Sequence, residues 1–149
     1  MLYLLDTNIL IYIIRGKRQF FFETYGLDNP SNQVVCSVVT IGELRSFAVR
    51  NKWGIAKCQM MENLLLEFSA IDINTNSILN KYAEIEAFSK GKLENRPLSI
   101  SSRTMGKNDI WIAATTSVLN ATLLTTDNDF NHLHNEFIEL QLIDNQLIT

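Results

Sequence analysis

The chain has 149 residues, of which 46% are hydrophobic and 19% are charged, a composition that is typical of a globular domain and excludes an intrinsically disordered chain. A chain of this length buries about two-thirds of the surface that it exposes when unfolded, which is enough for one hydrophobic core without structural metals or disulfides. We therefore expect a single domain over residues 1–149. No apolar run approaches the ~20 residues that span a bilayer, so we expect no membrane-spanning segment.

The two cysteines indicate a reducing compartment. Cys36 and Cys58 lie far apart, form neither a CxxC pair nor a disulfide framework, and follow no cationic and then apolar leader. We expect a soluble cytoplasmic protein with both thiols in or near its core.

The charges are unevenly distributed along the chain. Thirteen Lys and Arg against sixteen Asp and Glu give a net charge of −3, which argues against a protein that holds nucleic acid mainly by bulk electrostatics. Residues 90–107 nevertheless contain five basic residues, namely Lys90, Lys92, Arg96, Arg103 and Lys107, and a single acid, whereas no Lys or Arg follows Lys107. This basic segment is either a solvated loop beside an acidic surface or a positive rim that binds a substrate next to a cluster of carboxylates.

The first half of the chain alternates strand and helix patterns. Residues 1–5 are apolar and predict a buried strand that enters a helix, which we expect to end at Gly16. Residues 34–39 are β-branched and predict a second buried strand. Thr40 and Glu43 have the spacing of a capping box and predict a helix that ends at Trp53 and Gly54.

The second half continues the alternation. We expect helices over residues 55–68, 75–88, 109–120 and 128–135, strands over residues 70–73, 121–125 and 138–143, and a long loop over residues 90–106. Short buried strands interleaved with helices predict an α/β fold in which a five-stranded parallel sheet is flanked by helices on both faces.

Four acidic residues fall where strands end or helices begin: Asp6, Glu43, Asp109 and Asp127. In open α/β sheets ligands bind at the carboxyl ends of the strands, so these residues can meet in space. Each also has a structural explanation, as an N-cap (Asp6, Asp127), a capping-box partner (Glu43) or a complement to a helix dipole (Asp109). Asp109 fits that explanation least, because the apolar run that follows it draws it toward the core, where a carboxylate needs a partner or a metal.

A cluster of carboxylates indicates a divalent cation, because their mutual repulsion is relieved by a hard positive charge. Mg²⁺ is the natural ion for such a site, since it binds a few carboxylates, keeps several waters and accepts phosphate oxygens. The chemistry that follows is hydrolysis of a phosphodiester bond with one or two ions. Lys107 is either a group that steadies the developing phosphate charge or a solvated surface residue.

Other chemistries are poorly supported. His132 and His134 are two residues apart, a spacing that does not place both on one helix face, so we expect surface histidines rather than metal ligands. The chain contains no Gly-rich phosphate-binding loop and no serine nucleophile elbow. The run Phe20 to Phe22 favours packing over a platform for stacked bases.

Four segments resemble the motifs of the PIN-domain nucleases, in the same order and over essentially the whole chain. They are Leu5-Asp6-Thr7-Asn8-Ile9-Leu10, Thr40-Ile41-Gly42-Glu43-Leu44, Gly106-Lys107-Asn108-Asp109-Ile110-Trp111-Ile112-Ala113-Ala114 and Leu124-Thr125-Thr126-Asp127-Asn128-Asp129-Phe130. The compact length and the third segment resemble in particular the VapC toxins of bacterial type II toxin–antitoxin pairs.

The resemblance implies a five-stranded parallel sheet and an endoribonuclease that depends on Mg²⁺ or Mn²⁺. The metal-binding acids would be Asp6, Glu43, Asp109 and, as the fourth, Asp127, with Asp129 as the other candidate for that position. Asn8 would orient the Asp6 carboxylate, and Thr125 or Thr126 would support the site. The family also implies a homodimer and a small antitoxin that covers the site and inserts an arginine among the acids.

Two other functions remain compatible with these motifs. One is a non-catalytic PIN-like regulator that binds RNA or protein through the basic segment, and the other is a PIN nuclease that acts in RNA processing. Carboxylates at all four motif positions favour an enzyme, because a protein that only binds RNA gains nothing from negative charge that faces phosphates.

Overall fold

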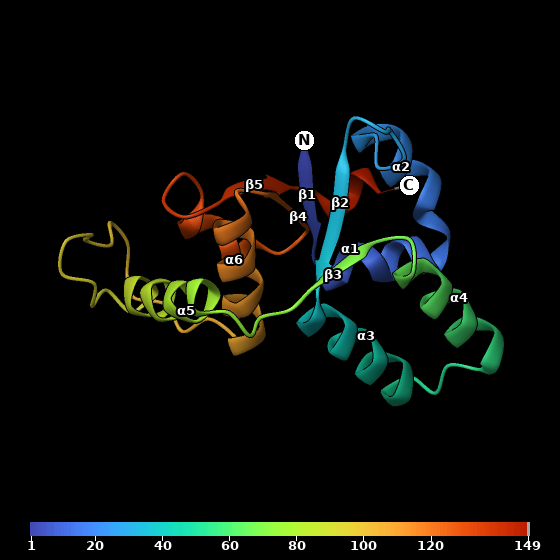
Figure 1. The fold of residues 1–149 in the computed structure, drawn as a ribbon, viewed down its shortest axis with the longest axis horizontal. Helices are drawn as coiled ribbons and strands as arrows, with labels where there is room; N and C mark the ends of the chain where they lie inside the picture. The colour runs from blue at the N-terminus through green and yellow to red at the C-terminus, as the bar shows by residue number, and fades with distance from the viewer. Residues whose placement is uncertain (149) are drawn as a thin grey trace.

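A computed structural model describes residues 1–148 of the chain. Its centre is one five-stranded sheet with the strand order β3-β2-β1-β4-β5, in which every neighbouring pair is parallel (Figure 1). The strands are β1 (Leu2–Leu5), β2 (Gln33–Ser37), β3 (Ser69–Ile71), β4 (Thr122–Thr125) and β5 (Glu139–Leu142). The prediction of a five-stranded parallel sheet flanked by helices is confirmed.

The helices form two groups, α1 to α4 and α5 with α6, which lie on different sides of the strands in Figure 1. They are α1 (Thr7–Tyr12), α2 (Arg18–Tyr25), α3 (Val38–Arg50), α4 (Ile55–Leu65), α5 (Asn76–Ser89) and α6 (Lys107–Leu119), with a π-helical turn η1 (Ile13–Lys17) and 3₁₀ turns η2 (Asn128–Leu133) and η3 (Asn145–Leu147). No helix among residues 1–148 is long and apolar enough to cross a bilayer.

The two groups of helices cover opposite faces of the sheet. Successive side chains of a strand point to opposite faces, so neighbouring strand residues pack against different groups of helices. Leu5 of β1 packs with the core formed by α1 to α4, whereas its neighbour Leu4 packs with the core formed by α5 and α6. Leu124 and Leu123 of β4 divide in the same way. Burial on both faces explains why successive residues of these strands, Leu4 with Leu5 and Leu123 with Leu124, are apolar.

The connection from α1 to α2 differs from the expected single helix that ends at Gly16. Gly16 does interrupt the helix, with φ +97°, but the chain continues at once into α2. Phe21 and Phe22 of that helix are buried in the core, as expected for packing residues. The sequence pattern does not predict this helix, because a run of three aromatic residues carries no helical period.

The start of α3 corrects a second expectation. β2 ends at Ser37, whose side-chain oxygen caps the helix by accepting a hydrogen bond from the backbone N–H of Val39 (3.1 Å). Thr40 is therefore inside the helix, and the predicted capping box of Thr40 and Glu43 is wrong. Glu43 accepts a hydrogen bond from the hydroxyl of Thr7 instead (2.7 Å), which brings its carboxylate to the end of β1.

The segment between α5 and α6 is a loop, as predicted, and it is tied to the body of the protein near its end. The backbone N–H of Arg103 donates to the carbonyl of Ser89 (2.7 Å), and the side chain of Met105 is buried. The Ser89 hydroxyl lies 2.8 Å from Nε2 of His132. His132 is therefore partly buried instead of a surface residue, and burial lowers its pKa, whereas His134 is exposed as expected.

Candidate functional site

The carboxyl ends of β1 and β4 bring together acids that lie far apart in the sequence. Asp6 follows β1 directly, and Asp127 lies two residues beyond the end of β4, which is hydrogen-bonded to β1. Asp109 lies in the first turn of α6. Glu43 reaches the same edge of the sheet from α3 through its hydrogen bond with Thr7. All four motif acids therefore gather at one edge of the sheet.

Asp6 is the most buried of these acids, with 4% of its surface exposed. Its Oδ1 accepts a hydrogen bond from the backbone N–H of Thr7 (2.7 Å), so it also caps α1. Its Oδ2 accepts a hydrogen bond from the hydroxyl of Thr125 (2.6 Å). Asn8, which we expected to orient this carboxylate, is exposed and makes no side-chain hydrogen bond to it within the described part of the chain.

The hydroxyl of Thr125 connects two of the acids. It donates to Asp6 and its oxygen accepts the backbone N–H of Asp127 (3.0 Å). Thr125 is fully buried, so water does not compete for these hydrogen bonds. Thr126, the other threonine of the motif, is half-buried and has no side-chain hydrogen bond among residues 1–148. The supporting role that we expected from either threonine therefore fits Thr125.

Thr7 connects another two acids, and sequence reasoning missed it. Its backbone N–H binds Asp6 and its hydroxyl donates to Oε1 of Glu43 (2.7 Å). The available signal was its position directly after the first acid, where a hydroxyl is within reach of neighbouring carboxylates.

Asp109, Asp127 and Asp129 form the tightest cluster of carboxylates. One oxygen from each lies within 4.8 Å of the other two. Asp109 and Asp127 are half-buried and Asp129 is exposed. Oδ1 of Asp127 accepts the backbone N–H of Asp129 (2.8 Å) and caps η2. Both residues are near enough to Asp109 to be the fourth acid.

The pKa of Asp6 is raised to about 6. Burial is the main cause, and the hydrogen bonds from Thr125 and Thr7 oppose it by stabilising the ionised form. The negative charges of Glu43 and Asp127 raise the pKa further. Burial and the neighbouring carboxylates therefore both disfavour the ionised form of Asp6.

The pKa of Asp109 is raised to about 7. Burial is again the largest cause, followed by the negative charges of the acids around it, namely Asp6, Asp127, Glu43 and Asp129. Because each acid raises the proton affinity of the next, the cluster behaves as one electrostatic unit with an excess of negative charge. A bound cation relieves such repulsion.

The donors present fit a divalent cation. All of them are carboxylate oxygens, the ligands that Mg²⁺ and Mn²⁺ prefer. Ligand oxygens of one Mg²⁺ lie at most about 4.2 Å apart, since each is about 2.1 Å from the ion. Oxygens of Asp109, Asp127 and Asp129 all lie within 4.8 Å of one another, a spacing close to that of ligands around one ion.

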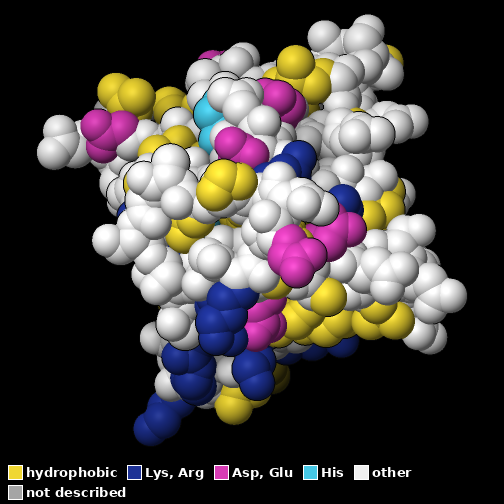
Figure 2. All heavy atoms as spheres, turned by 90° about the vertical axis from the view of Figure 1, so that its left-hand side faces the viewer, with side chains coloured by type: hydrophobic (Ala, Val, Ile, Leu, Met, Phe, Trp, Pro, Cys, Tyr) yellow, Lys and Arg dark blue, Asp and Glu magenta, His cyan; other side chains and the backbone are white. Residues whose placement is uncertain are grey.

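The basic segment does not form one continuous rim around the acids. Lys90 pairs with Glu86 (2.8 Å). Arg96 lies 3.8 Å from Glu136 and packs over the ring of Phe137 (4.3 Å), at the amino end of β5. Figure 2 shows Lys and Arg side chains gathered in the lower part of one face, with carboxylates beside and above them.

The remaining basic residues of the segment are Lys92, Arg103 and Lys107. All three are exposed and have no ion pair within residues 1–148. Lys107 begins α6 two residues before Asp109. These three, unlike Lys90 and Arg96, are free to meet a phosphate.

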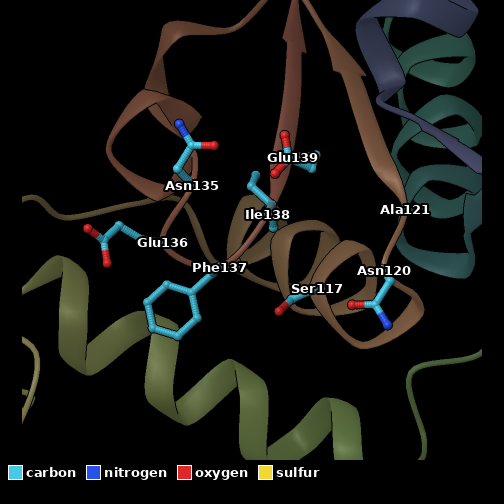
Figure 3. Close-up of a pocket in the computed structure, with 8 residues that line it drawn as sticks. All are labelled: Ser117, Asn120, Ala121, Asn135, Glu136, Phe137, Ile138 and Glu139. Atoms are coloured by element: carbon cyan, nitrogen blue, oxygen red, sulfur yellow. The ribbon is translucent and has the colours of Figure 1, made fainter.

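A separate cavity of about 240 Å³ lies at the other edge of the sheet (Figure 3). It is formed where β4 and β5 begin, and Glu136 and Glu139 are its only acids. None of the four motif acids contributes to it. This cavity is therefore not part of the candidate site.

The chain is similar in sequence to known proteins over most of its length. The family described as "PIN domain" matches residues 3–135. Ribonuclease VapC1 from Haemophilus influenzae is 30% identical over 126 residues, which are 84% of this chain and 86% of that protein. Ribonuclease VapC2 from Rickettsia felis is 26% identical over 140 residues, which are 93% of this chain and 97% of that protein.

Solved structures show the same fold. VapBC-1 from nontypeable Haemophilus influenzae superimposes with a TM-score of 0.74 at 26% identity, over 95% of this chain and 98% of that one. VapBC2 from Rickettsia felis, bound to a DNA fragment from its promoter, has a TM-score of 0.76 at 24% identity, over 97% of this chain and 100% of that one. Since the family match extends over most of the sequence, the chain belongs to the PIN-domain family, and VapC ribonucleases are among its relatives.

Proposed function

We propose that this protein is a metal-dependent endoribonuclease and the toxin of a type II toxin–antitoxin pair. The observation that carries the proposal is the gathering of Asp6, Glu43, Asp109 and Asp127 at one edge of the sheet, where the pKa values of Asp6 and Asp109 are raised. The similarity to proteins named ribonuclease VapC1 and VapC2 supports RNA as the substrate.

The four motif acids would hold Mg²⁺ or Mn²⁺, with Asp129 as the alternative to Asp127. When bound, the cation supplies an activated water and stabilises the leaving oxygen of a phosphodiester. The chain itself orients the acids: Thr125 and the backbone of Thr7 hold Asp6, and the Thr7 hydroxyl holds Glu43. Lys107, next to the acids, would steady the charge on the phosphate.

A purely binding role on the same fold is less consistent with the site. Negative charge that faces phosphates weakens RNA binding unless a cation neutralises it. We infer that Lys92 and Arg103, which are exposed and without ion pairs in the described chain, bind the RNA backbone. Lys90 and Arg96 would contribute less, because carboxylates lie near both.

We also infer a small antitoxin as the partner, a homodimer as the assembly and the cytoplasm as the compartment. Solved structures with a similar fold include VapBC complexes. An arginine of the antitoxin placed among these acids would satisfy the carboxylates and exclude the metal, because guanidinium binds carboxylates bidentately.

Replacing Asp109 with asparagine should reduce RNA cleavage at least about 100-fold, because it removes a metal-binding charge at nearly constant shape. The measurement is cleavage of total bacterial RNA by the purified, antitoxin-free protein with Mg²⁺ and with EDTA. Glu139→Gln, an exposed acid at the other edge of the sheet, is the control and should cleave normally. Full activity in both Asp6→Asn and Asp109→Asn would contradict the assignment.

Replacing Thr125 with valine should lower the affinity for Mn²⁺ about 10- to 100-fold, the usual effect of losing a group that orients a metal ligand. The substitution leaves Oδ2 of Asp6 and the N–H of Asp127 without their partner. Thr125→Ser keeps the hydroxyl and should bind nearly as the original chain does. Calorimetric titration with Mn²⁺ distinguishes the three proteins, and equal affinities would remove Thr125 from the site.

The metal-free protein should become less stable as the pH rises. The pKa values of Asp6 and Asp109 increase on folding, from 3.8 to about 6 and about 7, so folding favours their protonated forms. The stability that this provides is complete below pH ~4 and is lost as the pH rises through ~6 and ~7.

Thermal unfolding in EDTA at about pH 5 and about pH 8 measures this change. The Tm should fall less in Asp109→Asn than in the original chain, and saturating Mg²⁺ should restore the Tm of the original chain at the higher pH. An identical pH dependence in both proteins would show that Asp109 has an ordinary pKa.

Reversing the charge of Lys92 or Arg103 to glutamate should weaken RNA binding and reduce its salt dependence. Each lost phosphate contact lowers the slope of log K against log salt by about 0.7 for a single strand. Binding is measured in the Asp109→Asn background to avoid cleavage. Lys17→Glu, on the opposite side of the sheet, makes the same change in net charge and should leave the slope unaltered.

A further inference from the structure

A second hollow adjoins the acids, between α3 and α6. It has a volume of about 480 Å³, and its lining includes Glu43 at one end together with Asn108, which directly precedes Asp109. The hollow is therefore continuous with the candidate site, and the function proposed above does not assign it a ligand.

The side of the hollow formed by α3 has the carboxylate of Glu43 at one end and the guanidinium of Arg50 at the other. Glu43, Ser46 and Arg50 line the hollow from one face of the helix, as their spacing requires. Glu43 and Arg50 are seven residues apart, which is about 10 Å along a helix. The wall is thus negative where it meets the acids and positive at its far end.

The positive end is available to a ligand. Arg50 is exposed and has no ion pair within residues 1–148. Its guanidinium lies 5.8 Å from the centre of the Phe47 ring, and that of Arg15 lies 5.4 Å from the same ring. Of these two arginines, Arg50 lines the hollow, and an exposed guanidinium binds phosphate oxygens.

The α6 wall provides an aromatic surface. Trp111 lines the hollow and is only partly buried. Its ring is supported by Tyr82 of α5, with 4.1 Å between the ring centres. A base that stacks on such a ring gains affinity of about 5- to 150-fold. The amide of Asn108 and the hydroxyl of Ser46 add hydrogen-bonding groups that can read the edge of a base.

Gly42 keeps this space open. It lies inside α3 and lines the hollow, and an added Cβ would meet no atom within 4 Å. Glycine inside a helix is less stable than alanine, and nothing in the packing around Gly42 requires its small size. A larger residue there would project into the hollow.

We propose that this hollow binds one unpaired nucleotide of the RNA substrate next to the bond that is cut. The base stacks on Trp111, Asn108 and Ser46 contact its edge, and Arg50 binds the neighbouring phosphate. Unpaired bases are the usual targets of sequence-specific RNA recognition. The hollow therefore determines which base stands beside the cleaved bond. This inference rests on the proposed ribonuclease function in one respect, namely that the bound nucleotide is part of an RNA substrate.

The test uses the four nucleoside 5′-monophosphates as probes, in EDTA, so that neither metal nor cleavage is needed. The chain has only two tryptophans, Trp53 and Trp111, so Trp53→Phe assigns the indole N–H signals in an NMR spectrum. We expect saturable shifts of the Trp111 signal, with different affinities for the four bases. Arg50→Gln should weaken binding of the monophosphates.

Gly42→Leu fills the hollow without removing any packing group, and it should weaken nucleotide binding about tenfold or more. Gly54→Leu is the matched control, since an added Cβ at Gly54 also meets no atom within 4 Å and Gly54 does not line the hollow. Thermal unfolding of both variants establishes that they are folded.

The possible outcomes distinguish a failure of the proposed nucleotide site from a failure of the proposed ribonuclease function. A Trp111 signal that does not shift, or that shifts equally in Gly42→Leu, overturns the nucleotide site even if the protein cleaves RNA. In active protein, Gly42→Leu should change the preferred base at the cut site, and an unchanged preference also overturns the proposal. Nucleotide binding without any RNA cleavage would sustain the site and reject the ribonuclease function.

Discussion

The hydrogen bond between Thr125 and Asp6 is the interaction on which the candidate site depends. It joins the ends of two neighbouring parallel strands, β4 and β1, that are 119 residues apart in the sequence. A buried carboxylate is costly unless it is hydrogen-bonded, and the Thr125 hydroxyl and the N–H of Thr7 supply the bonds. Because the Thr125 oxygen also accepts the N–H of Asp127, one buried hydroxyl sets the positions of two acids.

The site combines a rigid part with an adaptable one. Asp6 and Thr125 are buried at the ends of central strands, and their hydrogen bonds hold them in place. Asp129 and the basic residues of the segment 90–107 are largely exposed and lie on loops or at helix ends. Such a division is suited to a nuclease, since the acids that hold a cation need fixed geometry whereas contacts to a flexible RNA do not. The hollow between α3 and α6 adjoins the site at Glu43 and Asn108.

Several features of the site could not be predicted from the sequence. The orienting role expected of Asn8 belongs to Thr7 and Thr125, because the end of β1 places Thr7 in the first turn of α1 and leaves the Asn8 side chain in solvent. Glu43 is not a capping residue, since β2 ends at Ser37 and the helix begins there. His132 is partly buried because α5 lies beside η2, with Ser89 within hydrogen-bonding distance. Each outcome depends on a contact between elements that are distant in the sequence.

By itself the sequence determined the class of fold and the edge of the sheet at which the acids gather. Continuous apolar runs must be buried on both faces, which requires helices on either side of a parallel sheet, and acids placed directly after such runs must lie at its carboxyl edge. Only the tertiary structure decided which hydroxyls hold the carboxylates, how far burial raises the pKa values of Asp6 and Asp109, and that α3 and α6 enclose a hollow beside them. Those properties arise from distances between side chains on separate elements, and local patterns do not encode such distances.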